Sequence, residues 1–249
     1  MITKNLFFLL FFIVQHSVGQ EFKTDSTALN KHVDFKHKAL LVPVFLIGYG
    51  VIGVENKQIK NINSEIKEEI VEHIDGKITI DDFSQYAPFA SVYTLNAMGI
   101  KGKNNIKDRT IILATAYLIM GGTVNILKKT SNIMRPDNSS KNSFPSGHTA
   151  TAFMGAEFLY QEYKDVSIWY GLSGYAVAAG TGYFRMYNDR HWLTDVAAGA
   201  GIGILSTKIA YWIHPLIKKT FFKNKENTNG IVMPFYNGKE YGMAMSMAF

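Results

Sequence analysis

Eight residues in three short clusters carry the groups that could bind and transfer a phosphoryl group. The stretch KKTSNIMRP supplies Lys128 and Arg135, PSGH supplies Ser146, Gly147 and His148, and RMYNDRHWLTD supplies Arg185, His191 and Asp195. Three permanent cations can surround a phosphate dianion, because arginine offers two parallel donors and lysine a compact charge. The clusters therefore indicate phosphoryl-transfer chemistry.

The two histidines suit different tasks in such a reaction. His191 and Asp195 are four residues apart, so they lie on one face of a helix. The carboxylate can hold one ring nitrogen and leave the other lone pair for phosphorus. His148 comes from a different helix start and is free to act as general acid on the leaving oxygen. The turn before it offers backbone N–H groups and the positive end of a helix dipole, which favour an anion.

Six apolar segments must position these residues. They are roughly Ala39–Val54, Tyr86–Met98, Thr110–Leu127, Thr149–Tyr160, Val166–Phe184 and Val196–Trp212. Each polar cluster lies where one segment ends or the next begins. In an up-and-down bundle with short connections, the end of one helix and the start of the next share a face. We therefore expect all three clusters to meet at one end of the bundle.

The fold class expected from these patterns is all-α: a bundle of about six core helices with the active site at one end. NSEIKEEIVEHI, with Ile66, Ile70 and Ile74 among charges, predicts an amphipathic surface helix. Near the C-terminus, Asn237-Gly238 separates two extended runs and predicts a short β-hairpin. The alternation after it is also typical of the last strand of an outer-membrane barrel, but one hairpin cannot close a barrel.

Composition narrows the class of protein. The chain has 249 residues, no cysteine and a net charge of +6. The basic residues are dispersed, which argues against nucleic acid as a partner. The N-terminal MITKNLFFLLFFIVQHSVGQ has a positive start, a short apolar run and small residues before a cleavage point, the pattern of an export signal. An uncleaved membrane anchor is the alternative.

The apolar segments fit either a membrane protein or a globular helical protein, and we favour membrane association. Basic stretches such as KGKNNIKDR (Lys101–Arg109) lie away from the clusters, so the positive-inside tendency places the clusters outside the cytoplasm. A cleaved signal then requires an even number of spans through Thr110–Leu127. We expect the short segment Tyr86–Met98 to be the one that fails to span.

Together the clusters resemble a known protein family. Lys-x6-Arg-Pro, then Pro-Ser-Gly-His, then Arg-x5-His-x3-Asp is similar to the tripartite signature of the type 2 phosphatidic acid phosphatase (PAP2) superfamily, with matching spacings. That superfamily also includes bacterial acid phosphatases and vanadium haloperoxidases. The resemblance covers about residues 85–212. One position departs from the pattern: members often have serine before the third-motif arginine, where this chain has Phe184.

The resemblance implies a role for each of the eight residues and requires no metal or other cofactor. Phosphate would be bound by the cations and by the backbone at the second motif: Lys128, Arg135, Arg185, Ser146 and Gly147. The reacting groups would be His191 as nucleophile forming a phosphohistidine, Asp195 as its orienting partner and His148 as general acid. The chain would divide into a signal peptide (1–19), an N-terminal helical region (20–84), a PAP2-type core (85–214) and a basic tail with the hairpin (215–249).

The leading hypothesis is a phosphatase acting on a lipid phosphate or diphosphate at the periplasmic face of a bacterial membrane. Candidate substrates are phosphatidic acid, phosphatidylglycerol phosphate, lipid A and undecaprenyl diphosphate. Three alternatives stay open: a soluble periplasmic acid phosphatase of broad specificity, a vanadate-dependent haloperoxidase, and a structural protein anchored through its hairpin. The expected partner is a phospholipid or isoprenoid phosphate, and the sequence does not specify an oligomeric state.

Overall fold

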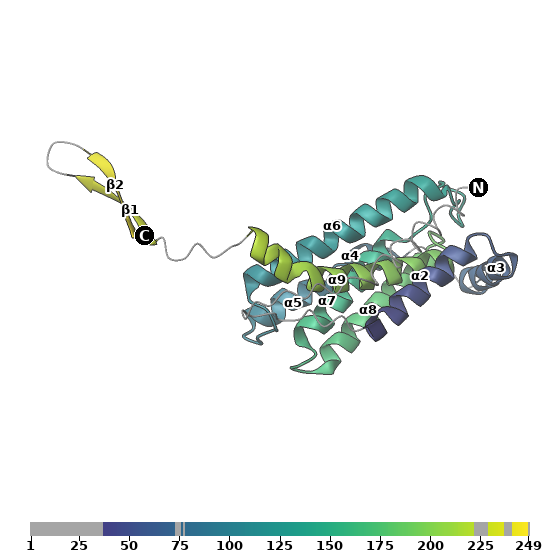
Figure 1. Cartoon of the computed structure of the whole chain (residues 1–249). Helices are drawn as coiled ribbons and strands as arrows, with labels where there is room; N and C mark the ends of the chain where they lie inside the picture. The colour runs from purple at the N-terminus through teal and green to yellow at the C-terminus, as the bar shows by residue number, and fades with distance from the viewer. Residues whose placement is uncertain (1–36, 73–75, 77, 222–228, 237–240, 249) are drawn as a thin grey trace, which may run out of the picture. The chain divides into compact units, whose positions relative to one another are not determined.

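The structure is a computed structural model that describes residues 37–72, 76, 78–221, 229–236 and 241–248. Each of the six predicted apolar segments forms a helix, which confirms the helical body. These helices are α2 (Leu41–Gly53), α5 (Ala87–Ala97), α6 (Ile106–Ser131), α7 (Gly147–Tyr163), α8 (Ile168–Tyr187) and α9 (Leu193–Phe221). Figure 1 shows α6, α7, α8 and α9 running along one another. The predicted signal, residues 1–19, lies outside the described residues.

The predicted amphipathic helix is α3 (Lys57–Val71), and it begins soon after α2 ends. The Asn56 side chain caps it by accepting hydrogen bonds from the amides of Gln58 and Ile59 at 2.9 and 3.1 Å. The axis turns by 96° between α2 and α3, so α3 does not continue the direction of α2. Two short elements were not predicted: the 3₁₀ turn η1 (His37–Leu40) and the helix α4 (Ile80–Ser84).

Helix α7 is the centre of the bundle. It packs against α5, α6, α8 and α9. Twelve of its 17 residues are buried, which is the pattern of a helix surrounded by others rather than lying on a surface. The main core forms where α5, α6 and α9 meet it, around Val92, Ile112, Met154 and Phe158. Because α7 begins at the second cluster, this burial fixes one wall of the candidate site.

Helices α7 and α9 approach so closely that only glycine fits between them. A Cβ atom on Gly199 would lie 2.5 Å from the carbonyl oxygen of Ser146, and one on Gly203 would lie 2.7 Å from the amide nitrogen of Met154. Both neighbours are backbone atoms and cannot rotate away. The glycines therefore let the start of α7 lie directly against the start of α9, where the second and third clusters meet.

We expect Gly203→Ala to destabilise the protein by about 1–3 kcal/mol, because the added methyl must push α7 and α9 apart. Thermal unfolding of the purified protein in detergent measures the effect. Gly121→Ala in α6 is the matched control, since nothing lies within 4 Å of its Cβ position. That helical substitution should be neutral or stabilising. Equal unfolding temperatures for the two variants would contradict the proposed close packing.

Two of the described helices are long and apolar enough to cross a membrane: α6, and the part of α9 from Leu193 to Thr220. The bent pair of α2 and α3 would make a third span if it counts as one. Helix α5 has only 11 residues and is not among these candidates. In α6 only 22% of the apolar stretch is buried, and Leu118 and Ile126 are exposed. An apolar helix face of this length suits lipid better than water.

Helix α9 continues past the predicted boundary at residue 214 and runs through Pro215 to Phe221. Asp108, at the start of α6, holds this last part. Its carboxylate lies 2.8 Å from Lys218 Nζ and 3.5 Å from His214 Nε2. The first residues of the expected basic tail are thus the end of a core helix.

Two strands follow, β1 (Asn229–Tyr236) and β2 (Tyr241–Ala248). They pair antiparallel, with Asn229 opposite Ala248 and Tyr236 opposite Tyr241. The Asn237-Gly238 turn predicted between them lies outside the described residues.

Candidate active site

The structure brings the three clusters together at one end of the helical body. Lys128 is in the last turn of α6, and Arg185 is in the last turn of α8. His148 is in the first turn of α7, and Asp195 is in the first turn of α9. Arg135 lies in the connection between α6 and α7, where Asn142 links it to Lys128.

Asn142 holds two of the cations side by side. Lys128 Nζ donates to its carbonyl oxygen at 2.7 Å, and Arg135 Nε donates to its side-chain oxygen at 3.0 Å. Burial lowers the pKa of Arg135, and the nearby positive charge of Arg185 lowers it further. Three cations that repel one another in this way are stabilised by an anion placed between them.

The second cluster forms a capped helix start. Ser146 is the N-cap of α7: its hydroxyl accepts from the Thr149 amide, and its own amide donates to the Asp195 carbonyl at 3.0 Å. A Cβ on Gly147 would lie 3.9 Å from Lys128 Cε, so the turn packs beside the lysine.

One expectation about this turn needs correction. The Ser146 amide was expected to bind phosphate, but the Asp195 carbonyl already occupies it. The amides of Gly147 and His148, in the first turn of α7, are the ones that an anion would meet. Ser146 instead joins the second cluster to the third.

His191 and Asp195 form a buried pair. His191 Nδ1 lies 3.5 Å from Asp195 Oδ2, and the two side chains are 2% and 1% exposed. The same carboxylate oxygen accepts from Ser143 Oγ at 2.5 Å and from the Trp192 amide at 2.9 Å, so its position is fixed. With Nδ1 facing the carboxylate, the Nε2 lone pair is the one left for an electrophile.

His191 is neutral at physiological pH. Burial lowers the pKa of its imidazole to about 4. The positive charges of Lys128 and Arg185 also lower this pKa, whereas Asp195 raises it. A histidine whose pKa is lowered carries its free lone pair at every pH above that value. This is the protonation state that a nucleophile needs.

The remaining two site residues face acidic partners that sequence reasoning missed. Arg185 Nη1 lies 2.5 Å from Asp81 Oδ2 and 3.6 Å from Asp82 Oδ1. His148 Nε2 lies 3.0 Å from Asp82 Oδ1. Both aspartates belong to the short helix α4, so an element outside the three clusters forms one side of the site.

The sequence pattern of the PAP2 superfamily matches residues 109–219. These residues are therefore similar to members of the PAP2 superfamily. The match runs from the start of α6 almost to the end of α9, so it includes the three clusters described above.

Two curated relatives match parts of this chain. Lipid A 1-phosphatase of Porphyromonas gingivalis is 42% identical over 139 residues, which are 55% of this chain and 31% of the relative. Bacitracin transport permease protein BcrC of Bacillus licheniformis is 35% identical over 74 residues, which are 30% of this chain and 34% of the relative. The chain thus covers about a third of the length of each.

Two solved structures are similar to part of this chain. Aquifex aeolicus LpxE has a TM-score of 0.47 and 25% identity, with 60% of this chain and 94% of that chain covered. The PAP2-type phosphatidylglycerolphosphate phosphatase of Bacillus subtilis has a TM-score of 0.46 and 20% identity, with 72% and 98% covered.

Four residues of the candidate site lie outside the three sequence clusters: Asn142, Ser143, Asp81 and Asp82. The first two lie in the connection that leads into PSGH, so their place in the chain was a signal that could have been followed. The aspartates come from far earlier in the chain, and no spacing relates them to the signature.

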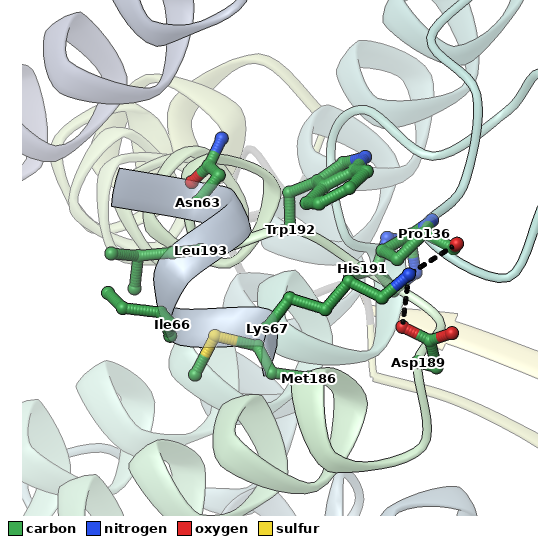
Figure 2. Close-up of a pocket in the computed structure, with 9 residues that line it drawn as sticks. All are labelled: Asn63, Ile66, Lys67, Pro136, Met186, Asp189, His191, Trp192 and Leu193. Atoms are coloured by element: carbon green, nitrogen blue, oxygen red, sulfur yellow. Dashed lines mark hydrogen bonds and ion pairs between the residues drawn. The ribbon is translucent and has the colours of Figure 1, made fainter. Parts of the chain in front are cut away.

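A small pocket flanks the candidate site beside His191 (Figure 2). Figure 2 shows Lys67 of α3 reaching across it. Lys67 Nζ donates to the Pro136 carbonyl at 2.8 Å, lies 3.4 Å from Asp189 Oδ1, and sits 5.6 Å from the Trp192 ring centre. Through Lys67, the amphipathic helix α3 therefore closes one side of the site.

Within the described residues, no group of three or more His, Asp or Glu side chains could hold a metal ion.

Proposed function

We propose that this protein is a phosphatase that removes a phosphate group from a lipid through a phosphohistidine on His191. The observation that carries the proposal is the neutral, buried His191, which Asp195 holds close to Lys128 and Arg185. Arg135 lies beside Lys128, because both donate to Asn142. A nucleophile poised among three cations suits a dianionic substrate whose phosphorus must be approached by a lone pair.

In the first step, His191 Nε2 attacks phosphorus while the bond to the leaving oxygen breaks. Lys128, Arg135 and Arg185 hold the phosphoryl oxygens and stabilise the charge that develops on them. His148 gives its proton to the leaving oxygen. Asp195 stabilises the positive charge that the His191 ring acquires when the nitrogen–phosphorus bond forms.

In the second step, water replaces His191 on phosphorus. His148, now neutral, takes a proton from that water and regains the form in which it began. Inorganic phosphate leaves, and His191 returns to the neutral state. The cycle balances with water as the only co-reactant.

Two observations support a lipid as the substrate. The relative from P. gingivalis is a lipid A 1-phosphatase, and its similarity covers more than half of this chain. Helices α6 and α9, which carry Lys128 and Asp195, are also the two candidate membrane spans. A site at the ends of two spanning helices would meet a lipid headgroup at the membrane surface.

We further propose that the site faces the periplasm, because basic residues that take no part in the site flank the other end of α6 and α9. Lys103 and Lys107 lie near the start of α6, while Lys218 and Lys219 lie near the end of α9. Labelling a single introduced cysteine with an impermeant reagent in intact cells tests this orientation. Labelling beside the site only after lysis would contradict it.

Phosphate release from a substrate panel tests the function. We expect release in EDTA from lipid A, phosphatidic acid, phosphatidylglycerol phosphate or undecaprenyl diphosphate, with lipid A favoured by the P. gingivalis relative. Rates are compared with p-nitrophenyl phosphate. Equal or faster turnover of p-nitrophenyl phosphate than of every lipid would favour a non-specific acid phosphatase. Halide oxidation on adding vanadate, without phosphate release, would favour a haloperoxidase.

A further inference from the structure

Asp82, the acidic partner of His148, belongs to helix α4, which lies outside the matched residues 109–219. Hydrogen bonds to the end of α8 fix the position of α4. Asn188, which follows the last residue of α8, donates to Asp81 Oδ1 at 2.9 Å. Its side chain also accepts a hydrogen bond from the Ile78 amide and donates one to the Ile78 carbonyl. Ser84 meets Thr181 at 2.8 Å between hydroxyl oxygens. These hydrogen bonds hold α4 against α8, and α4 in turn places Asp82 beside the site.

The two histidines are paired on opposite ring nitrogens. Asp195 faces Nδ1 of His191, while Asp82 faces Nε2 of His148 at 3.0 Å. A carboxylate on one ring nitrogen fixes which proton it holds and turns the other nitrogen outward. For His191 the outward atom is Nε2, and for His148 it is Nδ1. The site thus contains two Asp–His pairs, one buried and one half-exposed.

We propose that Asp82 is a positioning residue for His148: it orients the ring and favours its protonated form, so that Nδ1–H is the proton given to the leaving oxygen. This inference rests on the proposed function. As the leaving oxygen takes that proton, the phosphorus–oxygen bond breaks and His148 becomes neutral, still bonded to Asp82 through Nε2–H. In the second step Nδ1 takes a proton from the attacking water.

The charges around His148 make such a partner necessary. Burial lowers the pKa of His148, and the positive Arg185 of α8 lowers it further. Asp82 and Asp81 of α4 act in the opposite direction, and Lys128 of α6 adds another cation beside the neighbouring Gly147. Loss of Asp82 would remove the hydrogen bond and the negative charge that oppose this lowering, so the pKa of His148 would fall further.

The test is Asp82→Asn, compared with Asp165→Asn as matched control. Both aspartates are exposed, and Asp165 lies just after the C-terminal end of α7, the helix that carries His148 at its other end. For a lipid phosphate, we expect Asp82→Asn to lower kcat about tenfold to hundredfold near neutral pH. The high-pH limb of kcat/KM should move down by about one pH unit, because the protonated form of His148 is lost earlier as pH rises.

Three further readouts separate positioning from a general structural effect. KM should stay equal or fall, because a negative charge leaves the phosphate site. Activity should recover towards lower pH, and Asp82→Glu should restore much of the rate. Asp165→Asn should match the unaltered protein throughout. A high-pH limb that does not move, or a variant faster than the unaltered protein at every pH, would overturn the role of Asp82.

His191→Ala, run beside these variants, separates this proposal from the proposed function. If His191→Ala is inactive while Asp82→Asn has an unaltered pH profile, only the positioning role fails. If His191→Ala remains active, the phosphohistidine mechanism itself fails.

Discussion

His191→Ala is expected to lower lipid phosphate release by about 10⁵-fold or more, the scale on which loss of a nucleophile acts in enzymes that form a covalent intermediate. Alanine removes the atom that attacks phosphorus in the proposed first step. Asp195 stays buried with its bonds to Ser143 and Trp192, so the fold should persist.

Initial rates of phosphate release on the purified variant measure this effect. His214→Gln is the control, because His214 lies near the other end of α9, next to Asp108, and takes no part in the proposed chemistry. It should keep the rate of the unaltered protein. A folded His191→Ala protein that retains more than a few per cent of the rate would contradict the assignment.

The second large effect concerns stability at the end of the bundle opposite the site. Glu162 of α7 and Arg109 of α6 form an ion pair at 3.2 Å, and each side chain is about 1% exposed or less. The Glu162 carboxylate also accepts from the Asn104 amide and side chain and from Tyr211 Oη. It therefore joins α6, α7 and α9 with the loop before α6.

We expect Glu162→Ala to destabilise the protein by about 3–5 kcal/mol, because it leaves a buried arginine without a counter-charge. Arg109 Nη1 already lacks a hydrogen-bond partner among the described residues, so the guanidinium has little means of replacing the lost carboxylate. Unfolding in a denaturing detergent titration measures the change. The exposed Glu69→Ala is the matched control and should fall within about 0.5 kcal/mol of the unaltered protein.

A double variant distinguishes a buried charge from simple loss of packing. Arg109→Met with Glu162→Leu removes both charges and keeps similar volumes, so much of the stability should return. If the double variant is as unstable as Glu162→Ala, the unpaired arginine is not the cause.

The long helices and the meeting of the three clusters could be predicted from the sequence. Runs such as Thr110–Leu127 and Val166–Phe184 are too long and apolar for surface strands, and short connections force their ends to one side. Boundaries were less predictable: α6 starts earlier than its apolar run because Asn105 caps it, and α9 ends later because Asp108 holds its last turns. Capping and ion pairs leave little trace in hydropathy.

The acidic side of the site could not be predicted. Helix α4 has five residues, too few for a helical period, and Asp82 reaches His148 across 66 positions of sequence. The Ser146 amide was misassigned for a related reason. Its partner is the Asp195 carbonyl, and a backbone contact between two helix starts depends on the close α7–α9 packing that Gly199 permits.

The most direct test of the central claim is to trap the phosphorylated protein. In His148→Ala with p-nitrophenyl phosphate, the first step needs no proton donor because p-nitrophenolate is a good leaving group, whereas the second step lacks its base. Rapid quenching in alkali followed by mass spectrometry of peptides should therefore find a near-stoichiometric phosphoryl group on His191. Steady release of phosphate with no covalent phosphate on the protein, or phosphate on a residue other than His191, would contradict the account.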